Sequence, residues 1–217
     1  DVLTEDVADM ALALLLAAAR EVVAGDAHVR SGAWGREGNR PLARRVNGGL
    51  AGILGLGRIG RAVARRLEAM NVQVAYHNRR PIETPYIYYG SARELARDVD
   101  FLIVTAAGGD GSRGLVDREV IEALGPDGIL VNVARGSVVD EEALTAALRD
   151  GKLAAAGLDV FADEPRVPEA LRSLPNVVLQ PHMGSATVET RAAMADLVVR
   201  NLEAHFAGKL LPTPVPL

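Results

Sequence analysis

Between residues 49 and 186 the chain alternates short apolar runs with segments that have the apolar spacing of helices. The apolar runs cover residues 50–54, 72–76, 101–105, 129–133, 154–160 and 177–179. Helical patterns lie between them at residues 59–70, 91–97, 117–124 and 140–149. Continuous apolar strands separated by amphipathic helices are typical of a parallel sheet that is covered on both faces. The pattern therefore predicts an α/β fold with a doubly wound parallel sheet.

Two further segments flank this alternation. Residues 4–24 are rich in Ala and Leu and predict a helix that other parts of the protein cover, with Thr4 as its cap. Residues 25–48 contain several Gly, a Pro, Trp34 and many Arg, and they predict an irregular arm that serves function or assembly. A last helix is predicted over residues 187–206, and the Pro-rich tail cannot continue it.

Composition excludes several classes of function. The 217 residues include 24 Lys and Arg against 28 Asp and Glu, and a net charge of −4 argues against a strongly basic nucleic-acid binder. The absence of Cys excludes thiol catalysis, Cys-ligated metals and disulfides. The longest apolar run, residues 10–19, is far shorter than the about 20 residues of a bilayer-spanning helix. No two His residues have the spacing of metal ligands. We expect a cytoplasmic protein without metal, membrane or nucleic-acid partners.

A glycine-rich turn directly follows the first apolar run of the sheet. Gly55, Gly57 and Gly60 fit the pattern G-x-G-x-x-G between a strand and a helix. The first Gly permits the tight turn, the second admits a diphosphate to the backbone, and the third allows the helix to pack on the strand. The free N–H groups at the start of the helix, aided by Arg58, can bind that diphosphate. The turn therefore predicts a bound dinucleotide.

The end of the second strand indicates which dinucleotide binds. An NAD site usually has Asp or Glu here to hold the ribose 2′-hydroxyl, whereas this strand ends in His77, Asn78, Arg79 and Arg80. Two arginines and an amide favour a 2′-phosphate, which an acid would repel. We expect a preference for NADP(H), with NAD(H) as the alternative.

Three later strands end in polar residues that are suited to reduction of a carbonyl group. Arg135 follows the run 129–133, Glu164 follows the run 154–160, and His182 follows the run 177–179. Ligands of doubly wound sheets bind at the carboxyl ends of the strands, so these side chains are expected at the edge that holds the glycine turn. The guanidinium can hold a carboxylate, and the imidazole can give a proton to the developing alkoxide. Glu164, within reach of the imidazole, would favour its charged form.

Together these segments make the chain resemble the D-isomer-specific 2-hydroxyacid dehydrogenase family from about residue 4 to residue 212. The resemblance rests on four segments: GLGRIG at 55–60, VNVARG at 131–136, GLDVFADEP at 157–165 and QPHMGSA at 180–186. The Asn-Arg-Arg turn is similar to that of the NADPH-dependent glyoxylate and hydroxypyruvate reductases. The segment 105–110 departs from the family, where many relatives have a Pro-containing loop.

The resemblance implies a role for each candidate residue. Arg135 would be the substrate arginine, Glu164 the acid that orients the histidine, and His182 the proton donor. Asp159 would face the nicotinamide. The implied cofactor-binding set is Gly55, Gly57, Arg58, Ile59, Gly60, His77, Asn78, Arg79, Arg80, Ala106, Ala107, Val133, Ala134, Arg135, Asp159, His182, Gly184 and Ser185.

The resemblance also implies a division of the chain. Residues 1–48 would form an interdomain helix and dimerisation arm, residues 49–186 the dinucleotide-binding Rossmann domain, and residues 187–217 a helix and tail that return toward a substrate domain. That substrate domain is largely missing, so we expect a fragment, an isolated domain or only the ordered part of a longer chain. Without the partner domain, helices 4–24 and 187–206 would expose apolar faces.

The function expected from these features is NADPH-dependent reduction of a small 2-oxo acid, of the glyoxylate or hydroxypyruvate type, to a D-2-hydroxy acid by a homodimer. One alternative is a dinucleotide-sensing interaction module that resembles transcriptional co-repressors of this fold, although the chain has no basic face or low-complexity tail. Another is an inert cofactor-binding piece of the enzyme.

Overall fold

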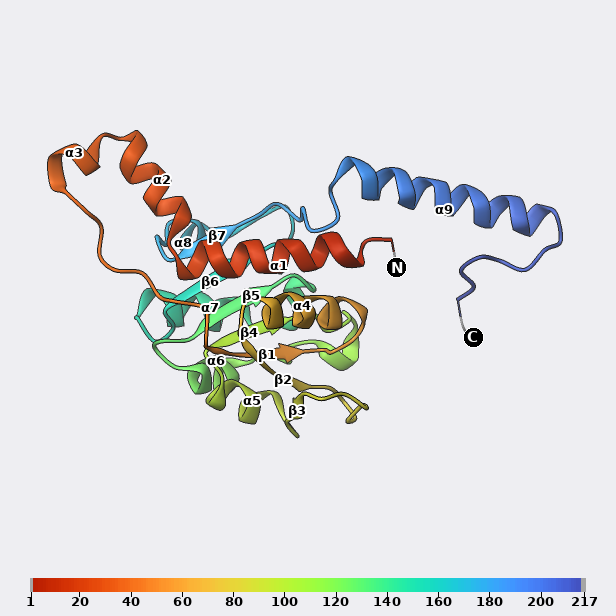
Figure 1. Ribbon diagram of the computed structural model, residues 1–217, viewed down its shortest axis with the longest axis horizontal. Coiled ribbons are helices and arrows are strands. Elements are labelled where there is room, and N and C mark those ends of the chain that lie inside the picture. The colour runs from red at the N-terminus through yellow and green to blue at the C-terminus, as the bar shows by residue number, and fades with distance from the viewer. Residues whose placement is uncertain (1, 216–217) are drawn as a thin grey trace.

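The computed structural model describes residues 2–215, which form one parallel sheet with helices on both faces (Figure 1). Within these residues the seven strands are ordered β3-β2-β1-β4-β5-β6-β7, and every neighbouring pair is parallel. The strands are β1 (Leu50–Leu54), β2 (Gln73–His77), β3 (Ile87–Tyr88), β4 (Phe101–Val104), β5 (Ile129–Asn132), β6 (Ala155–Leu158) and β7 (Val177–Leu179). The strand order reverses between β1 and β4, which is the point where ligands bind in such sheets. The predicted doubly wound sheet is confirmed.

Helices connect the strands and flank the sheet. They are α1 (Thr4–Ala19), α2 (Val22–Arg30), α3 (Ala33–Glu37), α4 (Arg58–Ala69), α5 (Ala92–Asp98), α6 (Arg118–Leu124), α7 (Glu141–Arg149), α8 (Glu169–Arg172) and α9 (Val188–Phe206), with 3-10 turns at Asp110–Ser112 and Gly136–Val138. None of the helices in residues 2–215 is long and apolar enough to cross a membrane.

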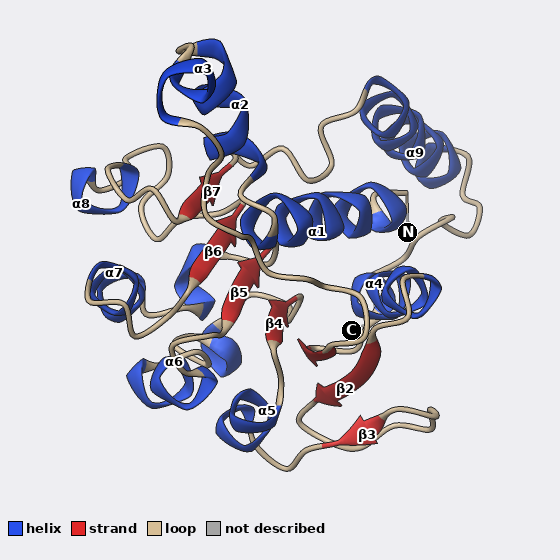
Figure 2. Cartoon of the chain, turned by 60° about the vertical axis from the view of Figure 1, so that its left-hand side comes forward, coloured by secondary structure: helices blue, strands red, loops and turns tan. Residues whose placement is uncertain are grey.

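Two apolar clusters fill the space between the sheet and its helices. Helices α1 and α4 cover one face, and α5, α6 and α7 cover the other (Figure 2). Neighbouring residues of a strand point to opposite faces, so Ile103 belongs to the first cluster while Leu102 and Val104 belong to the second. This two-sided burial explains why the strands are continuously apolar in sequence.

The first predicted helix and the arm after it differ from the sequence-based expectation. The helix predicted over residues 4–24 ends at Ala19, Glu21 has a left-handed φ of 51°, and a second helix begins at Val22. The arm predicted to be irregular is therefore partly helical, in α2 and α3. Thr4 is the first helical residue, and Leu3 takes the cap position.

The reason for the break is that only α1 belongs to the core. Eight residues of α1 are buried, against strands β5, β6 and β7 and helix α4, whereas α2 has no buried residue. Val22 and Val23 are 55% and 57% exposed. Apolar character alone does not show whether a helix packs on the sheet. Helices α2 and α3 lie away from it (Figure 1).

Helix α9 also stands away from the sheet (Figure 1). Thr190 is its one buried residue among those described, and Val188 and Phe206 are 84% and 83% exposed. The expectation that flanking helices expose apolar faces therefore holds for α9 and is wrong for α1, which the sheet covers.

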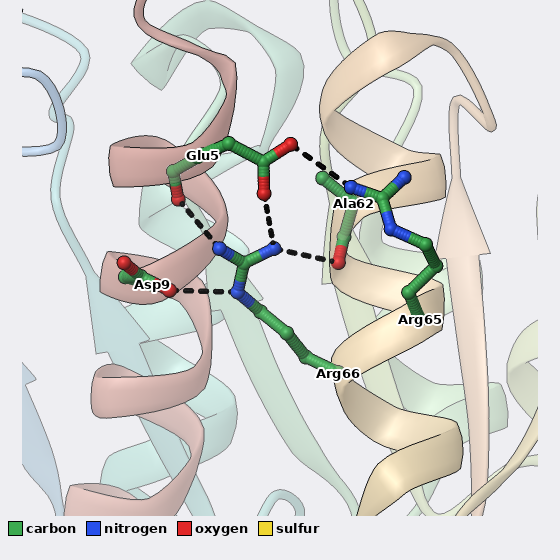
Figure 3. A network of polar contacts seen from close by, with 5 residues as sticks. All are labelled: Glu5, Asp9, Ala62, Arg65 and Arg66. Atoms are coloured by element: carbon green, nitrogen blue, oxygen red, sulfur yellow. Dashed lines mark hydrogen bonds and ion pairs between the residues drawn. The ribbon is translucent and has the colours of Figure 1, made fainter.

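An ion-pair network joins α1 to α4, the helix that follows the glycine turn (Figure 3). The Arg66 guanidinium donates to Glu5 Oε2 at 2.8 Å, to Asp9 Oδ1 at 2.6 Å and to the Ala62 carbonyl at 3.0 Å. Arg65 adds a second contact to Glu5 at 2.9 Å. The hydrogen bond from Arg66 lowers the pKa of Glu5. Because α1 also packs on the centre of the sheet, the network holds α4 in a fixed relation to the strands.

Candidate active site

The glycine turn between β1 and α4 has the geometry that a diphosphate site needs. Gly55 has a φ of 97°, and a Cβ there would lie 2.5 Å from the Ala106 Cα. A Cβ on Gly60 would lie 2.5 Å from the Gly55 carbonyl oxygen. Gly57, in contrast, is exposed and has no atom within 4 Å of where its Cβ would be. Two of the glycines therefore allow the turn to form, and the third leaves open space above its backbone.

The start of α4 fits a bound dinucleotide. Gly57 takes the cap position and has no side chain that could satisfy the first N–H groups of this 12-residue helix. Such N–H groups, together with the helix dipole, attract anions. Arg58 and Ile59 form the first turn, with Arg58 exposed. The open backbone at Gly57 and the anion-attracting helix start are together suited to the diphosphate of a nicotinamide dinucleotide.

Neighbouring strand ends hold the glycine turn in place. The Leu56 N–H donates to Asn78 Oδ1 at 2.7 Å, and the Gly55 N–H donates to the His77 carbonyl at 3.0 Å. The Thr105 hydroxyl, at the end of β4, donates to the Gly55 carbonyl at 2.8 Å. Thr105 was not among the predicted site residues, although a lone hydroxyl at the end of an apolar strand was a visible signal.

The turn after β2 lies beside the glycine turn, because His77 pairs with Leu54 in the register of the two strands. His77 Nδ1–H donates to the Tyr89 carbonyl at 2.9 Å, and its ring stacks on Tyr88. Arg79 and Arg80, which follow Asn78, are exposed. The four residues expected to select the cofactor therefore lie at the correct edge of the sheet, and their contacts with a cofactor stay predictions.

At the other end of the same edge, His182 and Glu164 form a direct pair. His182 Nδ1–H donates to Glu164 Oε2 at 2.7 Å, and Glu164 Oε1 accepts the Phe161 N–H at 3.0 Å. The imidazole is 45% exposed, so Nε2 is left to face a ligand. The sequence motifs placed these two residues 18 positions apart, and the fold brings them into contact.

The surroundings of the pair determine the charge of Glu164. Partial burial raises the pKa of Glu164, but the hydrogen bonds from His182 and the Phe161 N–H, with the charges of His182 and Arg135, outweigh it and leave the pKa below its ordinary value. Glu164 is therefore an anion at neutral pH. Because the carboxylate binds the imidazole at Nδ1, Nε2 is the ring nitrogen that can pass a proton to a ligand.

Arg135 lies within electrostatic range of this pair. Its Nη1 donates to the Ala134 carbonyl at 2.6 Å, and its stem packs on Gly108, where a Cβ would lie 2.6 Å from the Arg135 Cγ. Gly108 of segment 105–110 thus provides the room for this arginine. The structure therefore brings the three predicted catalytic residues to one edge of the sheet.

Asn132 and Gly136 were not among the predicted site residues, yet Asn132 holds the turn that bears Arg135, and Gly136 packs that turn against the segment that bears Glu164. Asn132 is 1% exposed; its Oδ1 accepts the Ala134 N–H at 3.0 Å and its Nδ2 donates to the Arg135 carbonyl at 3.2 Å. A Cβ on Gly136 would lie 1.9 Å from the Phe161 carbonyl carbon, so the segments that bear Arg135 and Glu164 touch through Gly136. The one sign of this support in the sequence was the polar Asn132 at the end of an apolar strand.

The remaining candidate residues also lie at this edge. Asp159 is 2% exposed, and both of its carboxylate oxygens accept backbone N–H groups, from Met183 at 2.6 Å and from Gly184 at 2.8 Å. Burial raises its pKa, and the two N–H groups counter that shift in part. The other predicted cofactor contacts range from buried to exposed: Val133, Ala134 and Gly184 are buried, Ser185 and Ala106 are half-buried and Ala107 is exposed. Within residues 2–215 there is no cluster of three or more His, Asp or Glu that could hold a metal.

Comparison with known proteins agrees with this geometry. The sequence model of the family described as "D-isomer specific 2-hydroxyacid dehydrogenase, NAD binding domain" matches residues 12–184. The chain is 53% identical over 216 residues to hydroxyphenylpyruvate reductase from Plectranthus scutellarioides, and 52% identical over 217 residues to glyoxylate/hydroxypyruvate reductase A from Arabidopsis thaliana. Each alignment covers 99% of this chain and 69% of the relative.

A solved structure shares the fold as well as the sequence. The NADPH-dependent glyoxylate/hydroxypyruvate reductase from Sinorhizobium meliloti, crystallised with NADP and malonate, superposes with a TM-score of 0.95 at 51% identity. The match covers 99% of this chain and 68% of that one. A nicotinamide dinucleotide site at the switch point, an acid–imidazole pair beside it and a family match over most of the chain lead to one conclusion: the chain belongs to the D-isomer specific 2-hydroxyacid dehydrogenase family of oxidoreductases.

Proposed function

We propose that this protein is an NADPH-dependent reductase that converts a small 2-oxo acid, of the glyoxylate or hydroxypyruvate type, into a D-2-hydroxy acid. The observation that carries the proposal is the 2.7 Å contact between His182 Nδ1 and Glu164 Oε2, beside Arg135 and along the edge that holds the glycine turn. Relatives that are about half identical to this chain are named as reductases of such acids, which supports the same class of substrate.

The residues of the chain divide the reaction between them. When bound, the reduced nicotinamide supplies a hydride for the carbonyl carbon of the substrate. Arg135 holds the substrate carboxylate and polarises the adjacent carbonyl group. His182 gives the proton on Nε2 to the carbonyl oxygen as negative charge develops there. Glu164 holds the imidazole by Nδ1 and stabilises its charged form before the transfer.

The preference for NADPH rests on the turn after β2. None of the five residues directly after the strand is an acid that could repel a 2′-phosphate, and Arg79 and Arg80 are exposed. Asn78 uses its Oδ1 to accept the Leu56 N–H, so the two amide hydrogens are left as donors. An amide that presents donors beside two guanidinium groups favours a phosphate over a hydroxyl group.

The test is an assay of the purified protein with a panel of small 2-oxo acids, following NADPH by its absorbance. Turnover of glyoxylate or hydroxypyruvate, with a lower Kd for NADPH than for NADH, is the expected result. Binding of dinucleotide without turnover of any 2-oxo acid in the panel would contradict the reductase proposal. Equal affinity for the two cofactors would contradict only the NADPH preference.

The division of the chain and its assembly are also part of the proposal. Residues 49–186 would bind the dinucleotide, residues 187–217 would extend toward a substrate domain, and residues 1–48 would form a dimer contact. The arm 22–42 supports the last point, because Trp34 and Val29 are each 57% exposed and Leu42 fully so. Large exposed apolar side chains of this kind are typical of an interface. Light scattering should give twice the monomer mass, and Trp34→Asp should return a monomer.

A further inference from the structure

We propose that Asp159 is a positioning residue, which holds the segment that carries His182 by its backbone; this role rests on the proposed reductase function. Three consecutive N–H groups of that segment bind to Asp159. The His182 N–H donates to its carbonyl oxygen at 2.9 Å, the Met183 N–H to Oδ1 at 2.6 Å and the Gly184 N–H to Oδ2 at 2.8 Å. The N–H of Asp159 itself donates to the Asn132 carbonyl, in β5, at 3.0 Å. The proton donor is thereby tied to the centre of the sheet through one residue.

The backbone of His182 needs such a hold. Its φ of 57° lies in the left-handed region, which is unfavourable for a residue with a side chain and persists only where the surroundings impose it. This conformation directs the imidazole to Glu164 at 2.7 Å. A segment freed from Asp159 would relax toward ordinary backbone angles, and the imidazole would turn away from its partner.

The space around the carboxylate is shaped for this contact. A Cβ on Gly184 would lie 2.8 Å from Asp159 Oδ2, so a side chain at position 184 would push the carboxylate off the N–H group it binds. Val7 of α1 also lies 3.5 Å from that Cβ position, so a side chain at 184 would have little room to turn away from the carboxylate. The bond therefore depends on glycine at 184 as well as on the acid at 159.

Only a carboxylate can make both side-chain contacts. Each of its oxygens accepts a hydrogen bond, whereas an amide would present its NH2 group to one of the two backbone N–H groups. Because Asp159 is 2% exposed, water could not replace the lost acceptor. Asp159→Asn thus keeps the size of the side chain and removes one of the two acceptors.

The experiment compares Asp159→Asn with Asp117→Asn in the 217-residue protein. Asp117 also accepts a backbone N–H, that of Val120 at 2.9 Å, but it does so at the start of α6 and outside the site. Three quantities are measured: kcat with a 2-oxo acid and NADPH, the Kd for NADPH, and the proton resonance of the His182–Glu164 hydrogen bond in 15N-histidine-labelled protein without cofactor. His182→Ala assigns that resonance.

The expected result for Asp159→Asn is a kcat at saturating NADPH that is lower by about 30- to 100-fold, together with loss of the resonance, whatever the Kd for NADPH. Asp117→Asn should change none of the three. An unchanged resonance and an unchanged kcat would overturn the proposal. A raised Kd with unchanged kcat at saturating NADPH would also overturn it, because Asp159 would then act by contacting the cofactor.

Gly184→Ala disrupts the same contact with Asp159 intact. If Asp159→Asn fails to fold, the His182–Glu164 resonance of Gly184→Ala tests the proposal: its loss is expected, and an unchanged resonance would overturn the proposal. The resonance is recorded without cofactor or substrate. A parent protein that reduces no 2-oxo acid would contradict the proposed function, while the resonance would still report whether Asp159 holds His182.

Discussion

The two halves of the candidate site lie along one edge of one sheet and are built by opposite means. The phosphate half, residues 55–60 with the turn 77–80, depends on the missing side chains of its glycines. Their absence leaves space above Gly57 and permits close packing at Gly55 and Gly60. The catalytic half, segments 132–136, 159–165 and 180–185, depends on side chains that are held by buried polar groups. One half therefore presents backbone to a ligand, and the other presents functional groups at set positions.

This difference teaches which changes each half tolerates. In the phosphate half an added methyl group meets backbone at Gly55 and Gly60 and enters the open ligand space at Gly57, so a small substitution is expected to disturb folding at the first two and binding at the third. In the catalytic half a functional group can be removed while the fold persists, because the imidazole and its partner are 45% and 35% exposed and make little of the core. Substitutions in the two halves should consequently separate stability and cofactor binding from turnover.

The largest expected effect is on turnover in His182→Ala. Removal of the proton donor should lower kcat by roughly 10²- to 10⁴-fold. The Kd for NADPH should stay within about threefold, because diphosphate binding belongs to the other half. His205→Ala, on exposed α9, is the matched control and should keep full activity. A variant at 182 that retains parental kcat would contradict the assignment of the proton donor.

Glu164→Gln should lower kcat near neutral pH by about 10- to 100-fold, since it removes the anion that orients the imidazole through Nδ1. The pKa of Glu164 lies below its ordinary value of 4.5, so the carboxylate is present above that pH and is lost only as the pH falls through the lowered pKa. In the parent this loss belongs to the acid limb of the pH–rate profile.

The substitution should also remove the contribution of residue 164 to the acid limb, because a glutamine side chain does not titrate. Glu169→Gln, an exposed acid of α8, is the control and should leave the acid limb in place. A profile for Glu164→Gln that coincides with the parental one would show that the Glu164 carboxylate does not contribute to the acid limb.

Two glycine substitutions should distinguish stability from cofactor binding within the phosphate half. Gly60→Ala should lower the free energy of unfolding by about 1–3 kcal/mol, because its Cβ would lie 2.5 Å from the Gly55 carbonyl oxygen. Gly57→Ala meets no atom within 4 Å and should keep the parental Tm, while its methyl group raises the Kd for NADPH by about tenfold. Thermal unfolding and fluorescence titration measure the two quantities. An equal loss of stability in both variants would contradict the distinction.

The smallest expected effect is a change of cofactor preference in Asn78→Asp. The carboxylate can still accept the Leu56 N–H, so the turn should persist, but its charge repels a 2′-phosphate. The ratio of the Kd for NADH to the Kd for NADPH should fall by about fivefold. Gln73→Glu adds the same charge at the far end of β2 and should leave the ratio unchanged. A ratio that stays at the parental value in Asn78→Asp would remove Asn78 from the selection of the cofactor.

The sequence by itself determined the sheet and the glycine turn, and it predicted which three residues are catalytic. These follow from local patterns: continuous apolar runs, glycines at set spacing, and polar residues directly after strands. Because the carboxyl ends of parallel strands meet at one edge, chain order alone was enough to predict that Arg135, Glu164 and His182 gather there. The two residues of β3 and the four of α8 form neither a continuous apolar run of strand length nor a helical period, and these elements were not predicted.

Tertiary structure alone decided where the first helix ends and what holds the catalytic residues. Helix α1 stops where the sheet stops covering it, and no local pattern states how far a sheet extends. The roles of Gly108, Asn132 and Gly136 arise from contacts with Arg135, Ala134 and Phe161. Most of these contacts join segments that are far apart in the chain, and such packing is a property of the folded arrangement rather than of any stretch of sequence.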